Sequence, residues 1–545
     1  MMIGEMIKNS MAPRSFQPSR HQRTPTLPTG VLILGLTVLS FLNAGLKSQA
    51  ANWYVDNAAT GANQGTNWAN AWTDLTKVVW GGRGVVPGDT LHISGGSTSK
   101  TYTNFWSVTV HGTAENRITI RVGQDAGHNG HVYFDGALHG DTFPVGQFTS
   151  LGRNYLTLDG SVNGANRMSY VNIVNTNSRS YGYSVLSSST AECSVRFVNF
   201  SNVNNGIKLG SGDGSAIHNC NFTVRGDSAI MQTADGTGWD KILLYSNNVT
   251  VWVKPGGGGP DGFQVRPGTS VFNNRFRAES VDLYTSGQHP DFIQGLDPRW
   301  FKFYGNECVN FGDAGVTLAP FYGTNGLQDI LIFNNIFRQT TLIDNVPEYI
   351  RFLTVDKTYN GFYKNVYIVN NLFADGTNAN TSILTTYREV ANAGVQGTNN
   401  WIANNIWVGS SRNAYNPMFN IWFTNNPSVW TITNNIYNPR PGSVGHVTYY
   451  GTNKTVTDFI ANYDPSGTTS LPQFVRYVPH AEANDFRLQA GDDVARDKGL
   501  DFSHLFTSDY DGNHRAGKWN IGPYQFQHST KAPSPPTALR LPFPN

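Results

Sequence analysis

One repeat constrains the fold of this chain more than any other feature of its sequence. A short apolar strand, a pair of asparagines and one or two more apolar residues recur, as in Ile332-Phe-Asn-Asn-Ile-Phe337 and Ile368-Val-Asn-Asn-Leu-Phe373. The second asparagine of each copy falls at positions 248, 274, 306, 335, 371, 405 and 435, which leaves gaps of 26 to 36 residues. Near-regular spacing with a variable remainder is typical of a solenoid whose coils carry loop insertions.

The segments between the repeats favour β-strands over helices. Runs such as Asp329-Ile-Leu-Ile-Phe333 and Asn365-Val-Tyr-Ile-Val369 place β-branched and aromatic residues with a period of two, and no run keeps the period of a helix. Units of about 30 residues are too short for a β-propeller blade, which needs four strands in roughly 40–45 residues. We therefore predict an all-β fold, a single-stranded right-handed parallel β-helix whose stacked asparagine amides hydrogen-bond from coil to coil.

The composition excludes several functional classes. The 545 residues include 39 Lys and Arg against 37 Asp and Glu, a net charge of +2, whereas nucleic-acid binding needs clustered basic residues. A chain that is 39% hydrophobic is too apolar to be disordered, and three cysteines cannot supply a disulfide framework. We therefore expect a large continuous core, no nucleic-acid partner and a monomer.

The first fifty residues have the pattern of an export signal. An apolar stretch over residues 30–42 precedes the small residues Ser48 and Ala50 and follows a basic region with Lys8, Arg14, Arg20 and Arg23. The apolar stretch is shorter than the ~20 residues that a membrane-spanning helix needs. We therefore predict a signal peptide cleaved near Ala50, a secreted protein (extracellular or periplasmic) and no membrane span after cleavage.

Both ends of the remaining chain carry segments that resemble one known superfamily. They are Asn52-Trp-Tyr-Val-Asp-Asn57, Val86-Pro-Gly-Asp-Thr-Leu-His-Ile93, Gly112-Thr-Ala-Glu-Asn-Arg-Ile-Thr-Ile-Arg121, Asp485-Phe-Arg-Leu488 and Asp509-Tyr-Asp-Gly-Asn-His-Arg515. From Trp53 to about Phe526, the chain resembles the right-handed parallel β-helix proteins of the pectate-lyase-like superfamily. The resemblance implies a polysaccharide lyase or a glycoside hydrolase, and its N-terminal part is similar to alginate-lyase and chondroitinase-like β-helices.

These patterns divide the chain into five segments. We expect a signal peptide over 1–50, an N-terminal cap with the first coils over 51–125, the body of the β-helix over 126–440, closing C-terminal coils over 441–527 and a proline-rich tail over 528–545. The Asn-Asn repeat is confined to the body, so a candidate site that depends on stacked coils belongs there.

Three neighbouring strands share a frame that brings carboxylates together. Asp261 and Asp291 begin two of these strands, and Asp313 lies one residue before the equivalent position in the next coil. Alternation along the strands places one set of side chains in the core (Phe263, Ile293 and Val316) and another set outside (Gln264, Gln294 and Thr317). Stacked coils lie about 4.8 Å apart, so the carboxylates are expected to influence one another.

A pair of like charges at that distance suits two kinds of chemistry. Repulsion raises the pKa of one carboxyl group, which makes it a general acid beside a base or nucleophile. Alternatively, Asp261 and Asp291 bind Ca²⁺, which prefers oxygen ligands and would acidify the proton next to a uronate carboxylate. A base or charge clamp would then come from Arg266, His289, Arg299 or Lys302. The predicted catalytic residues are therefore Asp261, Asp291, Asp313, Arg266, His289 and Lys302.

Polar and aromatic residues around the same coils are candidates for substrate binding. We predict contacts to sugar hydroxyls or sugar rings from Gln264, Gln294, Arg299, Trp300 and Tyr284. Structural alternatives stay open, because Asp-Gly at the start of a strand is ordinary turn chemistry and stacked glutamines can form an amide ladder.

The leading hypothesis is a secreted carbohydrate-active enzyme that cleaves a polysaccharide in a groove along the solenoid. Within it, β-elimination of a glycan that contains uronic acid comes first, and hydrolysis by a carboxylate pair comes second. A non-catalytic β-helix that binds glycans, or that serves as an extracellular structural module, is the third hypothesis. Ca²⁺ is the one cofactor that these hypotheses include.

Overall fold

The computed structural model describes most of the chain beyond residue 49. The described residues are 50–104, 106–137, 148–149, 154–173, 181–185, 192–210, 213–233, 235–252, 260–279, 291–320, 326–340, 348–353, 362–376, 385–387, 396–410, 420–421, 430–449 and 452–526. The chain divides into two units, residues 1–49 and residues 50–545. The predicted signal peptide up to residue 49, the predicted tail, Tyr284 and His289 lie outside the described residues.

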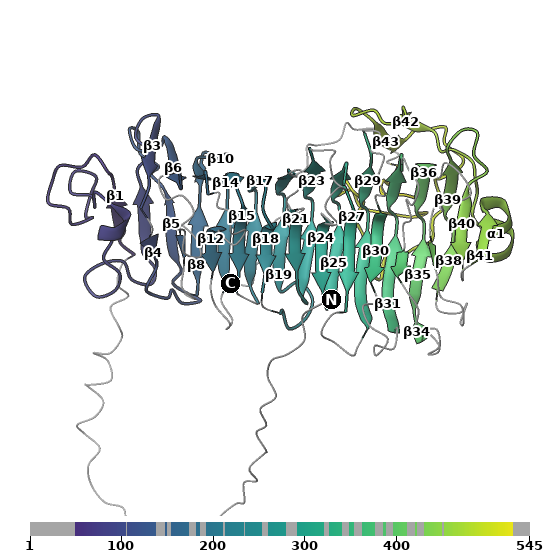
Figure 1. Cartoon of the computed structure of the whole chain (residues 1–545), viewed down its shortest axis with the longest axis horizontal. Helices are drawn as coiled ribbons and strands as arrows, with labels where there is room; N and C mark the ends of the chain where they lie inside the picture. The colour runs from purple at the N-terminus through teal and green to yellow at the C-terminus, as the bar shows by residue number, and fades with distance from the viewer. Residues whose placement is uncertain are drawn as a thin grey trace, which may run out of the picture. The chain divides into compact units, whose positions relative to one another are not determined.

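The described residues of the second unit form a parallel β-helix with three strands in each coil, as the repeat predicts. We name the three long sheets A, B and C in the order in which the chain visits them (Figure 1). One coil runs from β22 (Thr269–Phe272) in sheet A to β23 (Arg275–Ala278) in sheet B and then to β24 (Asp291–Leu296) in sheet C. Asn273 and Asn274 form the turn between sheets A and B, so the asparagine pairs mark one corner of the solenoid.

The strands of each sheet follow in coil order. In the described part of the chain, sheet A has 14 strands: β1 (Asn52–Val55), β2 (Thr90–Ile93), β5 (Ile118–Val122), β8 (Leu156–Asp159), β13 (Cys193–Arg196), β16 (Ser215–His218), β19 (Ile242–Tyr245), β22, β25 (Arg299–Tyr304), β28 (Leu327–Phe333), β31 (Phe362–Val369), β34 (Gln396–Thr398), β35 (Asn400–Ala403) and β38 (Trp430–Thr433). Sheet B has 12 described strands: β3 (Ser99–Tyr102), β6 (His131–Asp135), β11 (Met168–Val171), β14 (Val198–Val203), β17 (Asn221–Val224), β20 (Asn248–Val251), β23, β26 (Glu307–Val309), β29 (Ile336–Arg338), β32 (Leu372–Ala374), β36 (Ile406–Ser410) and β39 (Ile436–Pro439). Sheet C has 13 described strands: β4 (Trp106–Ser107), β7 (Phe148–Thr149), β12 (Tyr181–Val185), β15 (Asn205–Leu209), β18 (Ser228–Gln232), β21 (Asp261–Val265), β24, β27 (Ala314–Ala319), β30 (Glu348–Leu353), β33 (Thr385–Tyr387), β37 (Asn420–Ile421), β40 (His446–Tyr449) and β41 (Thr452–Thr455).

Short elements complete the described fold. Two antiparallel pairs lie outside the three sheets, β9 (Ser161–Val162) with β10 (Ala165–Asn166) and β42 (Phe474–Arg476) with β43 (Asp485–Leu488). A 3-10 turn η1 covers Leu75–Lys77, and the helix α1 (Val456–Tyr463) follows the antiparallel hairpin of β40 and β41. Among the described residues, no helix has the length and apolar character that crossing a membrane requires.

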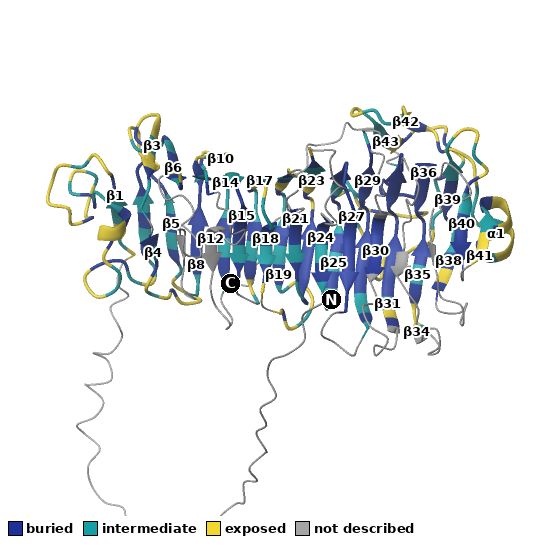
Figure 2. Cartoon of the chain, in the orientation of Figure 1, coloured by how far each residue is buried: buried dark blue, intermediate teal, exposed yellow. Residues whose placement is uncertain are grey.

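The core lies between the three sheets, because alternate side chains of each strand point inward (Figure 2). In sheet A, one inward row passes from coil to coil through side chains that are 0% exposed: Leu244, Val271, Phe303, Ile332 and Ile368. Phe263, Ile293 and Val316 in sheet C are buried to the same extent, which confirms the predicted alternation. Their outward neighbours therefore form continuous rows on the surface of the solenoid.

The second asparagine of each pair forms a buried ladder along the corner between sheets A and B. Asn335 is typical: its backbone N–H and its Nδ2 donate to Oδ1 of Asn371 at 3.0 and 2.9 Å, and Nδ2 also donates to the carbonyl of Phe303 at 2.8 Å. The row contains Asn247, Asn274, Asn306, Asn335, Asn371, Asn405 and Asn435. The predicted amide stacking is confirmed, but the choice of Asn248 for this row is wrong, because Asn247 is 1% exposed and bonds Asn274 whereas Asn248 is exposed in β20.

The first residue of each pair has a different role. It adopts the left-handed backbone conformation, with φ of 53° at Asn334, 55° at Asn370 and 55° at Asn404, and asparagine tolerates this region better than most residues. Its amide points outward and hydrogen-bonds the C-terminal segment: Asn334 Nδ2 donates to the carbonyl of Ser508 at 2.7 Å, and Asn404 Nδ2 donates to that of Leu500 at 2.9 Å. Asn-Asn pairs therefore combine an internal ladder with an external attachment.

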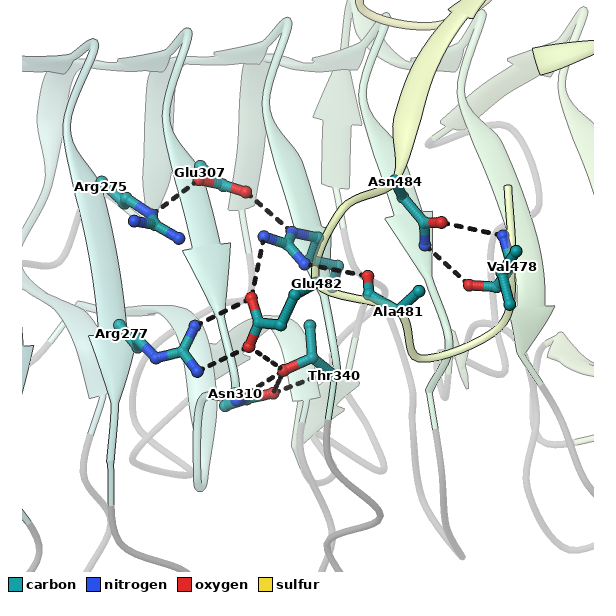
Figure 3. Close-up of polar contacts among 10 residues, drawn as sticks. Arg275, Arg277, Glu307, Asn310, Thr340, Val478, Ala481, Glu482 and Asn484 are labelled. Atoms are coloured by element: carbon teal, nitrogen blue, oxygen red, sulfur yellow. Dashed lines mark hydrogen bonds and ion pairs between the residues drawn. The ribbon is translucent and has the colours of Figure 1, made fainter. Parts of the chain in front are cut away.

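Residues 464–526 form this C-terminal segment, which covers part of the outer faces of sheets A and B. The ring of Phe506 stacks on Phe333 of sheet A with centroids 4.2 Å apart. Figure 3 shows Glu482 on sheet B, where Arg277 donates two hydrogen bonds of 3.1 and 2.6 Å and Thr340 donates one of 2.9 Å. The hydrogen bonds from Arg277 lower the pKa of Glu482 to about 2, so this carboxylate stays ionised and holds the segment in place.

The C-terminal end of the asparagine ladder is Asp464, which is 0% exposed. Its Oδ2 accepts hydrogen bonds from the backbone N–H and the Nδ2 of Asn435 at 3.2 and 3.0 Å and from the hydroxyl of Tyr437 at 2.9 Å. Burial raises the pKa of Asp464 above the ordinary aspartate value. Asp464 thus takes the position of one more asparagine, with a carboxyl group in place of the amide.

The ladder predicts a large difference between two adjacent asparagines. Asn247→Ala leaves the backbone N–H of Cys220 and the carbonyl of Ile217 without the amide that they bond, and each buried group left unsatisfied costs about 1–3 kcal/mol. We expect Asn247→Ala to lower the free energy of unfolding in urea by roughly 2–4 kcal/mol. The control Asn248→Ala removes an exposed amide contact and should change the free energy of unfolding by less than about 0.5 kcal/mol. Equal effects would contradict the buried ladder.

Asp464 predicts a pH dependence of stability. The pKa of Asp464 is raised in the folded state. Its contribution to the free energy of unfolding is therefore complete below the ordinary aspartate pKa of about 4, and it is lost as pH rises through the raised value. Asp464→Asn continues the amide ladder without a titrating group. We therefore expect the variant to melt at a higher temperature than the wild type at pH 7, with the difference shrinking towards pH 4. Parallel melting curves across this range would contradict the prediction.

Candidate functional site

The candidate carboxylates lie at one end of neighbouring strands in sheet C. The register pairs Phe263 with Ile293 and Gln264 with Gln294, so Asp261 and Asp291 occupy equivalent positions at the starts of β21 and β24. Asp291 also pairs with Ala314, which places Asp313 one residue before the start of β27. The structure therefore brings together the three carboxylates that the shared frame predicts.

Asp261 takes part in the hydrogen bonding that begins the next strand. Its Oδ1 accepts the backbone N–H of Asp291 at 3.0 Å, and its Oδ2 accepts Nε2 of Gln264 at 2.9 Å. Asn205 has the same role two coils earlier, where its Oδ1 accepts the backbone N–H of Ser228 at 2.9 Å. The carboxylate of Asp261, which is 4% exposed, thus supports the fold at this edge of sheet C.

Asp291 and Asp313 share one guanidinium group, that of Arg351 in β30. Arg351 Nη2 lies 2.9 Å from Oδ1 of Asp291 and 2.7 Å from Oδ2 of Asp313. The same nitrogen donates to Oγ1 of Thr317 at 3.0 Å. Asp291 is 0% exposed, Asp313 5%, Arg351 8% and Thr317 1%. The contacts among them are therefore shielded from water.

Burying the charged groups of this cluster costs free energy. Two buried carboxylates contact one guanidinium group, and Asp261 lies one coil away. Removing ions from water costs several kcal/mol each, and a partner of opposite charge returns only part of that cost. A buried group of ions on the outer side of a sheet is therefore a candidate for a reactive site.

The contacts also test the predicted Ca²⁺ site. Three of the four carboxylate oxygens of Asp261 and Asp291 already accept hydrogen bonds or an ion pair from protein donors. A calcium ion would have to displace Gln264 or Arg351, and among the described residues no group of three or more metal-binding side chains gathers. The described geometry does not match a Ca²⁺ site, and calcium binding stays a prediction for titration to test.

Of the predicted basic residues, Arg266, Arg299 and Lys302 lie at or beyond the other end of the sheet C strands. Arg266 follows β21 and pairs with Asp235 at 2.8 Å, whereas Lys302 lies in sheet A and pairs with Asp240. Arg299 and Trp300 begin β25 in sheet A, beyond the C-terminal end of β24. Five residue steps of about 3.3 Å separate the two ends of β24, so its C-terminal end lies roughly 16 Å along the strand from Asp291. The structure does not bring them together with the carboxylates.

The predicted glutamines are only partly accessible. Gln264 and Gln294 are half-buried on the outer face of sheet C, in the same row as Thr317 and Arg351. Gln264 hydrogen-bonds the carboxylate of its own strand, Asp261, at 2.9 Å. Tyr284 and His289 lie outside the described residues, so their predicted roles stay predictions.

Arg351 is the residue that the sequence interpretation missed. It contacts Asp291 across 60 positions of sequence, with one coil between them. The sequence does contain a signal: in Glu348-Tyr-Ile-Arg-Phe-Leu353, alternation places Arg351 in the outward row of Gln264, Gln294 and Thr317. Extending the frame by one coil would have added it to the candidates.

Comparisons with known proteins show similarity of fold. No known protein-family model and no curated protein sequence matches this chain. Among solved structures, the pectate lyase Pel9A is similar with a TM-score of 0.41 and 13% identity, over 88% of this chain and 97% of that one. The GH136 lacto-N-biosidase from Eubacterium ramulus is similar with a TM-score of 0.43 and 12% identity, over 72% of this chain and 68% of that one. XylC in complex with xylose is similar with a TM-score of 0.43 and 9% identity, over 87% of this chain and 98% of that one. The chain is a parallel β-helix protein, as its own three sheets establish.

The shared guanidinium predicts a strong effect on stability. Arg351→Met leaves Asp291 and Asp313 buried without their cation, and breaking a buried ion pair in this way costs about 3–5 kcal/mol. Urea unfolding measures the loss. In the triple variant Arg351→Met, Asp291→Asn, Asp313→Asn, the stranded charges are gone and part of the stability should return.

An exposed arginine provides the control for this prediction. Arg275 pairs with Glu307 at 3.0 Å on sheet B, and its side chain is 50% exposed. Arg275→Met should cost less than about 1 kcal/mol, as is usual for surface ion pairs. A comparable loss for Arg275→Met and Arg351→Met would show that the buried cluster is not held by its charges.

Proposed function

We propose that this chain is a polysaccharide-cleaving enzyme that binds glycan across the outer face of sheet C and reacts at Asp291, Asp313 and Arg351. The observation that carries the proposal is the pair of buried carboxylates that share one guanidinium nitrogen. The fold does not need a guanidinium at this position: the register aligns Arg351 with Thr317, Gln294 and Gln264 of the three preceding coils, which are uncharged. We therefore attribute the free-energy cost of burying these charged groups to their role in glycan cleavage.

The charge of the cluster favours hydrolysis over β-elimination, which the sequence places first. Elimination from a uronic-acid glycan needs positive charge to neutralise the substrate carboxylate. Here the one guanidinium already contacts two carboxylates, and the described cations Arg266, Arg299 and Lys302 lie at the other end of the strands. A pair of carboxylates at one site instead suits the positive charge that develops on the sugar ring during glycoside hydrolysis.

The separation of the two carboxylates supports one stereochemical route. Because Oδ1 of Asp291 and Oδ2 of Asp313 both contact Nη2 of Arg351, they are no farther apart than the sum of 2.9 and 2.7 Å. Retaining glycosidases hold their carboxyl groups about 5–5.5 Å apart, whereas inverting enzymes need roughly 6.5–9.5 Å for an intervening water. We therefore propose a retaining mechanism, in which one carboxylate attacks the sugar and the other carboxyl group protonates the leaving oxygen.

Arg351 has a positioning role in this mechanism. Its guanidinium contacts both carboxyl groups and holds them side by side. One ionised and one protonated carboxyl group are the states that nucleophile and general acid require. Thr317, bonded to the same nitrogen at 3.0 Å, fixes the guanidinium between them.

Export of the protein and action outside the cell belong to the same proposal, and they rest on the N-terminal signal pattern of the sequence. A polysaccharide substrate is consistent with export, because long glycans occur outside the cell. N-terminal sequencing of protein recovered from the medium or periplasm tests it, since cleavage near Ala50 is expected.

A panel of polysaccharides tests the proposed function, with reducing ends and ultraviolet absorbance measured together. We expect new reducing ends without the absorbance of an unsaturated product, and no loss of activity with a chelator. Asp291→Asn and Asp313→Asn should each reduce turnover roughly 100-fold or more, because each removes one of the two reacting carboxyl groups. Unsaturated products that disappear with the chelator would instead establish calcium-dependent β-elimination.

The control for these variants is Asp329→Asn in sheet A. Asp329 has φ of 58° and is aligned with Asn365 and Asn399, so asparagine fits there and turnover should be unchanged. Full turnover in both Asp291→Asn and Asp313→Asn would reject the site. If no glycan in the panel is cleaved but one is bound, the non-catalytic hypothesis replaces the enzyme.

A further inference from the structure

We propose a second glycan-binding subsite at the turn from sheet C to sheet A, built from Trp300, Arg299 and Trp239. It would hold a pyranose ring that presents a hydrogen-bond acceptor, a hydroxyl or a carboxylate, to Arg299. The substrate class rests on the proposed function, but the subsite lies at the other end of the sheet C strands from Asp291 and Asp313. Its evidence is independent of the carboxylate cluster.

The backbone at Trp300 is the first observation. Its φ is 51°, in the left-handed region that L-residues with large side chains rarely adopt. The register aligns Trp300 with residues that tolerate this conformation in neighbouring coils: Gly268, Asp329, Asn365 and Asn399, with φ of 82°, 58°, 54° and 61°. Tryptophan is thus placed where folding alone favours glycine, aspartate or asparagine. Strain of this kind indicates a side chain retained for what it contacts.

Arg299 is the second observation. Its guanidinium carbon lies 4.3 Å from the ring centroid of Trp300. Its guanidinium group makes no ion pair or hydrogen bond among the described residues, and its Nε is buried without a hydrogen-bond partner. An unsatisfied buried donor costs stability, so this group is suited to an acceptor that arrives with a ligand. The stacking on Trp300 fixes its direction in advance.

Trp239 is the third observation. It is 37% exposed, whereas most described aromatic side chains are buried or stacked on one another. Lys302 Nζ lies 5.3 Å from the centroid of its ring and pairs with Asp240, and Ser270 Oγ donates to Asp240 at 2.5 Å. These contacts fold the loop of Trp239 over sheet A towards β25, the strand that begins with Arg299 and Trp300. The Trp239 ring therefore lies by Lys302, two residues along β25 from Trp300 and three from Arg299.

The chemistry of this surface fits a sugar better than a nucleic acid or an acidic protein. Two neighbouring cations are neutralised, Arg266 by Asp235 at 2.8 Å and Lys302 by Asp240, which leaves little of the clustered positive charge that nucleic-acid binding needs among the described residues here. The C–H bonds of a pyranose pack on the face of an aromatic ring, whose quadrupole is negative there. One guanidinium beside two indole rings offers this apolar contact together with directed donors for ring substituents.

The variant Trp300→Asn tests the subsite because it should act in opposite directions on stability and on binding. Asparagine relieves the backbone strain, as at Asn365, so the melting temperature should stay the same or rise. Affinity for soluble polysaccharides, measured by electrophoresis in native gels that contain them, should fall about tenfold or more. Trp252→Ala is the matched control: Trp252 is also 37% exposed and Arg225 stacks on it at 5.4 Å, but it lies elsewhere, after β20.

Two forms of one polysaccharide distinguish the acceptor that Arg299 recognises. Arg299→Met should weaken binding of polygalacturonate alone if the acceptor is a carboxylate, and of both polygalacturonate and its methyl-esterified form if it is a hydroxyl. Unchanged binding by Trp300→Asn, a lower melting temperature of that variant, or an equal loss in Trp252→Ala would overturn the subsite. So would a wild-type protein that binds no polysaccharide in the panel used for the cleavage test.

The same measurements separate this inference from the proposed function. Binding is read without turnover, so a protein that cleaves nothing but binds through Trp300 keeps the subsite and loses the enzymatic proposal. If cleavage depends on Asp291 and Asp313 but binding does not depend on Trp300, the enzymatic proposal is kept and the subsite is rejected.

Discussion

The rest of the structure depends on the buried asparagine ladder between sheets A and B. Each amide receives the backbone N–H of the preceding coil and donates to a carbonyl in the core, as Asn335 does with Asn306 and Phe303. A coil that slipped by one residue would leave these buried donors and acceptors without partners, at a cost of about 1–3 kcal/mol for each group. The ladder therefore fixes the register of each coil against the next. The register in turn decides which side chains of all three sheets face outward.

The candidate site is a consequence of this fixed register. Gln264, Gln294, Thr317 and Arg351 come from four successive coils, and they form one row because each strand begins at the same place in its coil. Arg351 reaches back along the row to Asp291, past the intervening strand that contains Thr317. A site of this kind has no local motif in the sequence. It exists only when coils separated by roughly 30 residues are stacked in register.

This explains what the sequence could predict and what it could not. Alternation and the asparagine repeat predict the fold, the inward positions of Phe263 and Ile293 and the shared frame of the aspartates, because these depend on one strand or one turn. They do not predict which outward side chain crosses a neighbouring coil, so Arg351 was missed. Proximity in sequence was misleading for Arg266 and Lys302, since one strand is enough to carry a residue to the other end of sheet C. The two roles of each asparagine pair were also invisible, because the outer role needs the returning C-terminal segment.

The balance of charge on the outside of the solenoid connects the two sites. Only 14% of the residues are charged, and described cations such as Arg266, Arg277 and Lys302 each have a carboxylate partner. Two described places stand out: Asp291 and Asp313 share one guanidinium group, and the side chain of Arg299 makes no ion pair or hydrogen bond among the described residues. They lie at opposite ends of the sheet C strands, so one glycan that crosses the sheet in the strand direction can meet both. A substrate held at Trp300 by its ring and at Arg299 by an acceptor would then extend towards the carboxylates, which links recognition at one edge of the sheet to reaction at the other.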